Sequence, residues 1–100
     1  MNIPKNNLSR NSYYNCYSDL QRASKSLYLT PNSNVTITFL DHAIKLLEND
    51  KNGNVPKYCE KLLDIRKVLA DKERLSQLGT ARTADKILTL GILLRDSNPN

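Results

Sequence analysis

The sequence contains few of the residues from which catalytic and metal sites are built. Its 100 residues include one histidine, two cysteines, three glycines and no tryptophan. A zinc site gathers three or four Cys, His or carboxylate ligands at short spacings, but the sequence has no HExxH motif, no paired histidine and no Cys/His array. We therefore expect the one histidine, His42, to be a surface or boundary residue and the protein to have no metal site.

The scarcity of glycine and histidine also argues against catalysis. Gly53, Gly79 and Gly91 lie far apart, so the chain lacks a glycine-rich loop that could cradle a phosphate. A nucleophilic serine or threonine needs a base within hydrogen-bond reach, and no GxSxG turn marks such a nucleophile. The sequence therefore predicts a non-enzymatic protein with no catalytic residues, no cofactor and no small-molecule substrate.

Long apolar segments are missing as well. No run approaches the ~18 residues that cross a bilayer, and the N-terminus lacks the apolar core of a secretory signal. The first acidic residue is Asp19, which leaves a transit peptide as an alternative. Cys16 and Cys59 have no CxxC spacing and are typical of reduced intracellular thiols, with Cys59 expected to be buried. These features predict an intracellular protein, cytoplasmic or nuclear, without membrane association.

What is present is the composition of one small folded domain, with 39% hydrophobic and 25% charged residues. The net charge of +5 is spread along the chain: residues 1–40 carry four bases and one acid, and residues 41–100 carry eleven bases and nine acids. Opposite charges three residues apart, such as Lys61 with Asp64 and Asp64 with Lys67, predict a solvated helix face. We interpret the basicity as ordinary surface charge rather than as a nucleic-acid footprint.

Apolar residues recur at helical spacing through most of the chain. This pattern predicts helices over residues 12–29 and 34–50 and a third from about residue 56 to 70. A short segment follows, which Asp71 can cap and which stops at Gly79. The last helix is expected from Thr80 or Thr83 to about Arg95. Residues 1–11 have no apolar period and predict a flexible tail, and residues 97–100 predict a disordered end. The expected fold is all-α, a small antiparallel bundle of about four helices over residues 12–96.

One segment gives conflicting signals. Residues 35–39 alternate apolar residues with threonine and are rich in β-branched side chains, which favours a strand. A lone strand has no partner, however, and no second strand signal occurs in the chain. Read as a helix, the segment places Val35, Phe39 and Ala43 on one face. We therefore predict a helix here.

Residues 74–88 resemble a helix-turn-helix motif, with Leu78 before a turn glycine, Gly79, and Arg82 near the start of a second helix. Two residues depart from the motif. Asp85 stands where the motif buries an apolar side chain, and Arg74 takes a position that a small residue normally holds. We interpret the segment as an ordinary helix junction and keep a small basic nucleic-acid-binding protein with a degenerate helix-turn-helix as the alternative function.

The last helix has more apolar residues than one core-facing stripe can use. Ile87, Leu90 and Leu94 share a face and suffice for the core of a small bundle. The remaining apolar residues, Leu88, Ile92 and Leu93, are expected at the surface, where an exposed contiguous patch usually marks an interaction site.

Two tyrosines extend this expected interface. Tyr13 and Tyr17 are four residues apart on one helical face, and tyrosine is enriched where proteins bind one another. The sequence thus predicts a protein–protein interaction module, such as a small adaptor, regulator or assembly subunit. The expected partner is another protein or, in a homodimer, a second copy of the chain, with nucleic acid as the alternative.

Overall fold

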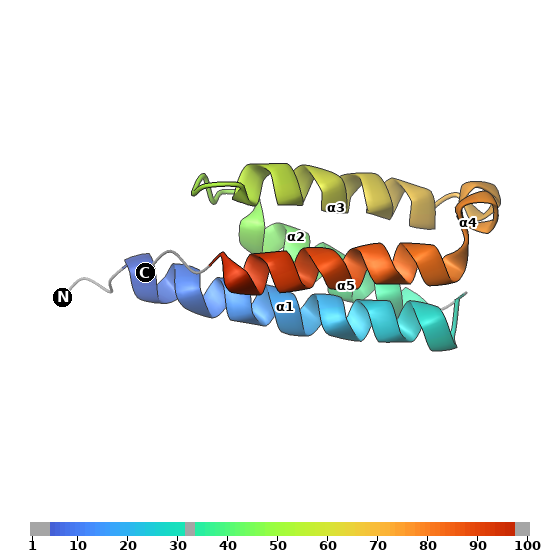
Figure 1. The fold of residues 1–100 in the computed structure, drawn as a ribbon, viewed down its shortest axis with the longest axis horizontal. Coiled ribbons are helices and arrows are strands. Elements are labelled where there is room, and N and C mark those ends of the chain that lie inside the picture. Colours follow the sequence, from blue (N-terminus) through green and yellow to red (C-terminus); the bar gives the residue numbers. More distant parts are fainter. Residues whose placement is uncertain (1–4, 32–33, 98–100) are drawn as a thin grey trace.

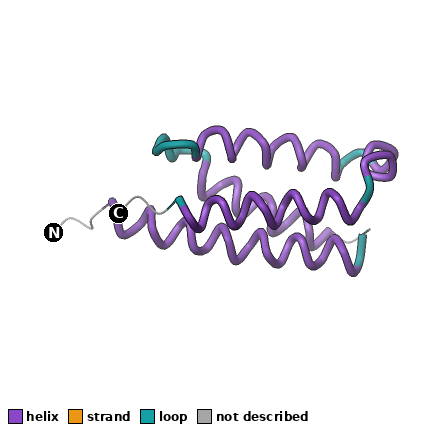
Figure 2. Tube along the Cα trace, viewed as in Figure 1, coloured by secondary structure: helices purple, strands orange, loops and turns teal. Residues whose placement is uncertain are grey.

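The structure, a computed structural model, describes residues 5–31 and 34–97. The described residues form five helices and no strand, which confirms the predicted all-α class (Figure 1, Figure 2). The helices are α1 (Lys5–Leu29), α2 (Asn34–Leu47), α3 (Val55–Leu69), α4 (Lys72–Leu78) and α5 (Thr80–Asp96).

Four of the helices form an antiparallel bundle. Along the chain, α1, α2, α3 and α5 alternate in direction, and the short α4 crosses the end of the bundle between α3 and α5 (Figure 1). Helix α1 packs extensively against both α2 and α5, whereas α3 packs against α2 and most loosely against α5. The sequence prediction of a small antiparallel bundle is thereby confirmed.

The N-terminal helix is longer than the sequence pattern predicts. Helix α1 begins at Lys5, so residues 5–11 of the predicted flexible tail are helical. Residues 5–11 have no apolar periodicity and therefore offer no face for packing. Their Asn, Ser, Lys and Arg residues can still extend a helix that the packed residues after them have nucleated. Residues 1–4 and 98–100, which complete the two predicted tails, lie outside the described residues.

The segment with conflicting signals is helical, as predicted. Residues 35–39 lie within α2, where Thr36 is buried and its hydroxyl donates to that of Ser26 on α1 at 3.1 Å. Helix α2 ends at Leu47, three residues before the predicted Asp50. The chain turns there because the Asp50 side chain accepts a hydrogen bond from the backbone N–H of Asn52 at 2.9 Å, a local bond that competes with the helix.

The junctions around α4 have the predicted caps. The Asp71 carboxylate accepts hydrogen bonds from the backbone N–H groups of Glu73 and Arg74, at 3.1 and 3.2 Å, and so starts α4. Gly79 ends α4 with a φ of 95°, a left-handed conformation that favours glycine, and α5 begins at the next residue. The short helix α4, with these two ends, connects the end of α3 to the start of α5.

The core consists mainly of leucines and other apolar residues from all five helices. Leu20, Leu27, Leu40, Leu62 and Leu94 are among the fully buried side chains. Both cysteines are free and buried, which confirms the predicted burial of Cys59. Burial raises the pKa of Cys16 to about 12, so this thiol stays protonated at neutral pH.

Candidate functional site

The apolar residues left over on α5 differ in exposure, and they do not all line the same hollow. Leu88 is half-buried, and Ile92 and Leu93 are exposed. Leu88 lies beside Tyr28 on the edge of α5 that faces α1, and Ile92 follows it by four residues, one helical turn further along. Leu93 follows Leu88 by five residues, about 140° around the helix, and lies on the edge that faces α3.

The two predicted tyrosines occupy different environments. Tyr13 is 1% exposed and belongs to the core, so its side chain is not part of the surface. Tyr17 is half-buried, and the guanidinium of Arg95 on α5 lies over its ring at 4.8 Å from the centroid. The two tyrosines were predicted to extend an interface with a partner, but the contacts that the structure shows for them are with the bundle itself.

The side of the bundle between α3 and α5 contains a groove of about 520 Å³. Ile65 from α3 and Leu90 from α5 are buried at its base, and Leu93 lies beside them with 41% of its surface exposed. The charged side chains along the groove are Lys61, Asp64, Arg82, Asp85 and Lys86. The structure thus combines an apolar base with charged rims on both walls.

A second hollow of about 520 Å³ continues the groove toward α4. The two hollows share Asp64, Ile65 and Lys86. The second adds Val68 and the 43% exposed Leu78 to the apolar surface, and it adds Lys67 and Arg74 to the charged surface. The open surface therefore runs along both helices rather than forming a closed pocket.

The groove exists because α5 packs closely on α1. Gly91 is buried on α5, and a Cβ atom placed there would lie only 3.2 Å from the Cβ atom of Leu20 on α1. Two turns nearer the start of α5, the buried hydroxyl of Ser24 on α1 donates to the carbonyl oxygen of Ala84 at 2.8 Å. These small residues let the backbones of α1 and α5 approach each other, which holds α5 on the α1 side of the bundle.

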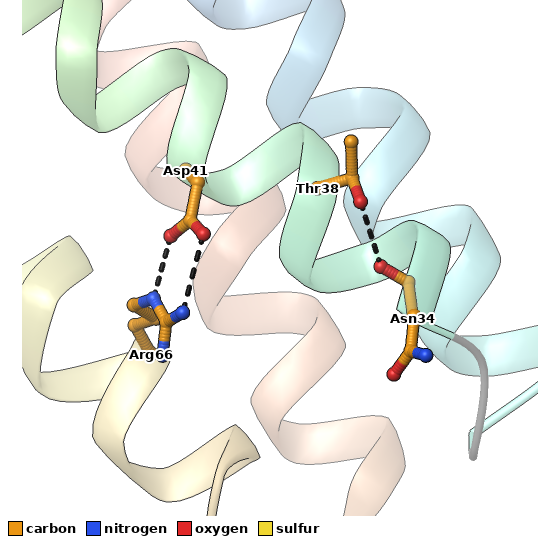
Figure 3. A network of polar contacts seen from close by, with 4 residues as sticks. All are labelled: Asn34, Thr38, Asp41 and Arg66. Carbon is orange, nitrogen blue, oxygen red and sulfur yellow. Dashed lines mark hydrogen bonds and ion pairs between the residues drawn. The ribbon is translucent and has the colours of Figure 1, made fainter.

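Helix α3 is tied to the opposite side. The Arg66 guanidinium on α3 donates two hydrogen bonds to the Asp41 carboxylate on α2, at 2.6 and 3.2 Å (Figure 3). This bidentate geometry is the strong form of an ion pair, although both side chains are partly exposed. With α5 held by α1 and α3 held by α2, the α3–α5 side is left as the loosest contact of the bundle.

Among the side chains that the structure describes, the bases of the groove have no ion-pair partner. Within residues 12–31 and 34–97, the ion pairs are Arg66 with Asp41, Arg95 with Asp96, and His42 with Asp19. The opposite charges that the sequence places three residues apart, Lys61 with Asp64 and Asp64 with Lys67, do not come within 4 Å of each other. The groove bases are therefore available to an external anion.

His42 has a role that the sequence does not show. Its Nδ1 atom pairs with the carboxylate of Asp19 on α1, which is buried, while the imidazole itself is largely exposed. The pair joins α1 to α2 and gives a buried carboxylate its partner. Among the residues that the structure describes, no three His, Cys, Asp or Glu side chains lie close enough to hold a metal ion.

Comparisons with family models, with curated protein sequences and with solved structures give no significant match. In the part of the chain that the structure describes, no helix has both the length and the hydrophobicity to cross a membrane.

Proposed function

We propose that the protein is a small non-enzymatic interaction module, an intracellular adaptor, regulator or assembly subunit, that binds another protein through the α3–α5 groove. The observation that carries this proposal is the exposed Leu93 beside the buried Ile65 and Leu90 on the open side of the bundle. Exposed apolar side chains around a groove are typical of protein-binding sites, where their burial supplies the affinity. Leu93 is the one residue of the predicted interface that lines this groove.

Replacing Leu93 with lysine tests the proposal. The substitution should abolish recovery of the native partner by affinity capture, because it puts an ammonium group against the apolar base of the groove. The stability of the free protein should change by only ~0.5 kcal/mol or less, since the position is exposed. Thermal melting followed by circular dichroism measures the stability.

Ile92→Lys is the matched control, because Ile92 is a similarly exposed neighbour that does not line the groove. This variant should recover the same partner as the unchanged protein. The proposal fails if Leu93→Lys retains the partner, or if Ile92→Lys loses it as completely as Leu93→Lys does.

A small nucleic-acid-binding protein is the second candidate function, and the unpaired bases of the groove favour it. A complex through several phosphates would lose affinity by orders of magnitude between 50 and 200 mM salt. An interface built on Leu93 would respond far less, because burial of apolar surface is insensitive to screening. A salt titration of the captured complex therefore separates the two functions.

A further inference from the structure

We propose that the occupant of the α3–α5 groove is an acidic amphipathic α-helix of a partner protein. This inference rests on the function proposed above and names the chemistry of the partner. It follows from the shape of the groove, from its charge, and from the charges of the chain's own helices.

The shape of the groove fits a short helix. Its walls are α3 over residues 61–68 and α5 over residues 82–93, two antiparallel helices with an open side between them. The α5 wall spans about 16 Å, since a helix rises about 1.5 Å per residue, so a bound helix of three turns would fill it. Leu93, Ile65 and Leu78 offer apolar contacts from one end of the groove to the other. A helix seated in such a groove contacts it with residues at i, i+3 or i+4, and i+7.

The charge of the groove selects an acidic partner. Five bases line the two hollows, and only two acids, Asp64 and Asp85, accompany them. The bases come from both walls and from the α4 end, and the full set is Lys61, Lys67, Arg74, Arg82 and Lys86. Because none of them has an ion-pair partner within the described residues, acidic side chains on both flanks of a bound helix would find them available.

A second copy of the chain does not meet this requirement. In a twofold dimer through the groove, the excess of bases on one copy would face the same excess on the other. None of the five described helices carries more acidic than basic residues, so the described chain does not supply an acidic helix of its own. The charge complementarity therefore points to a different protein.

A nucleic acid would leave the distinctive features of the groove unused. No aromatic side chain is among the residues that line either hollow, so bases of a single strand would have no stacking platform there. A phosphate backbone would also leave the apolar base formed by Ile65 and Leu90 uncovered. An amphipathic helix, in contrast, covers the apolar base and pairs with the basic rims.

A displayed library of helical peptides tests the inference. The probe is a set of peptides of about 14 residues with leucine at the contacting positions of a three-turn helix, and with Glu, Gln or Lys allowed at each flanking position. Selection on the full-length protein, with binders to Leu93→Lys removed, should enrich Glu over Lys at the flanks. In fluorescence anisotropy, the selected peptide should bind at least about tenfold more tightly than its Glu-to-Lys counterpart.

Charge reversal in the groove supplies the control. The double variant Arg82→Glu/Lys86→Glu should lose about tenfold or more in affinity for the acidic peptide. Lys57→Glu/Lys72→Glu makes the same change in net charge at exposed positions outside the groove and should bind as the unchanged protein does. Equal losses in the two variants would show attraction by the net charge alone and would overturn the inference.

Other outcomes also overturn it. Enrichment of Lys at the flanks, or a selection without binders that depend on Leu93, contradicts an acidic helix as the occupant. Binding of a 20-nucleotide single strand that disappears in Arg82→Glu/Lys86→Glu assigns the groove to nucleic acid instead. Unless the groove is assigned to nucleic acid, the proposed function stands as long as capture of the native partner still depends on Leu93. In that case only the acidic helix is excluded as the occupant.

Discussion

Replacing Leu62 with lysine should unfold the domain at room temperature. Leu62 lies on α3 and is fully buried in the core. Truncating a buried leucine already costs about 2–5 kcal/mol, and an ammonium group in the same place adds a desolvation penalty of several kcal/mol. The total stability of a domain of this size is about 5–15 kcal/mol, so the substitution removes most or all of it. The far-UV circular dichroism of the variant should lack a cooperative thermal transition.

The next residue in the chain provides the control for this experiment. Leu63 is 43% exposed, so Leu63→Lys should change the free energy of unfolding by only ~0.5 kcal/mol or less. A one-residue shift along α3 moves the side chain about 100° around the helix, from the core to solvent. Similar melting of the two variants would mean that α3 does not present the Leu62 face to the bundle.

Replacing Gly91 with valine should have the second-largest effect. A Cβ atom at this position would lie 3.2 Å from the Cβ atom of Leu20 and 3.5 Å from the Cδ1 atom of Tyr17. The valine methyl groups extend further, so α1 and α5 must separate or adjust. Overpacking of this kind typically costs about 1–3 kcal/mol, which urea denaturation can measure as a lower midpoint at unchanged m-value.

Two further variants serve as controls for the Gly91→Val experiment. Gly91→Ala adds only the Cβ atom, and the helix propensity of alanine, better than that of glycine by about 1 kcal/mol, offsets part of the strain. Thr89→Val places the same valine at an exposed position of α5 and should change stability by only ~0.5 kcal/mol or less. A Gly91→Val variant as stable as the unchanged protein would contradict the close approach of α1 and α5.

The features that the sequence predicted best depend on local interactions. Asp71 caps α4 by bonding to backbone groups two and three residues away, and Gly79 ends it through its own φ, so both signals are contained in a few neighbouring residues. The helical state of residues 35–39 also followed from the sequence, because a strand without a partner has no ladder to join. The start of α1 was missed because residues 5–11 have no packing pattern that distinguishes a polar helix from a tail.

The candidate site depends on tertiary packing and was predicted only in part. The surplus of apolar residues on α5 was evident from the sequence. Their spacing does not show which edge of α5 packs beside α1 and which beside α3, and it is this packing that places Leu93 and Leu88 in different hollows. Likewise, His42 meets Asp19 across 23 residues of sequence, and neither residue has a local signal for the other. The unpaired bases of the groove were masked by acids at helical spacing that do not pair with them in the structure.

An NMR titration with the captured partner tests the central claim that the α3–α5 groove is the binding surface. With isotope-labelled methyl groups, the signals of Ile65, Leu90 and Leu93 should shift on binding, because these side chains lie in the groove. The signals of Leu88 and Ile92, which do not line the groove, should shift far less and serve as internal references. Shifts at Leu88 and Ile92 without shifts at Ile65 and Leu93 would contradict the account and place the interface on the α1 side of α5.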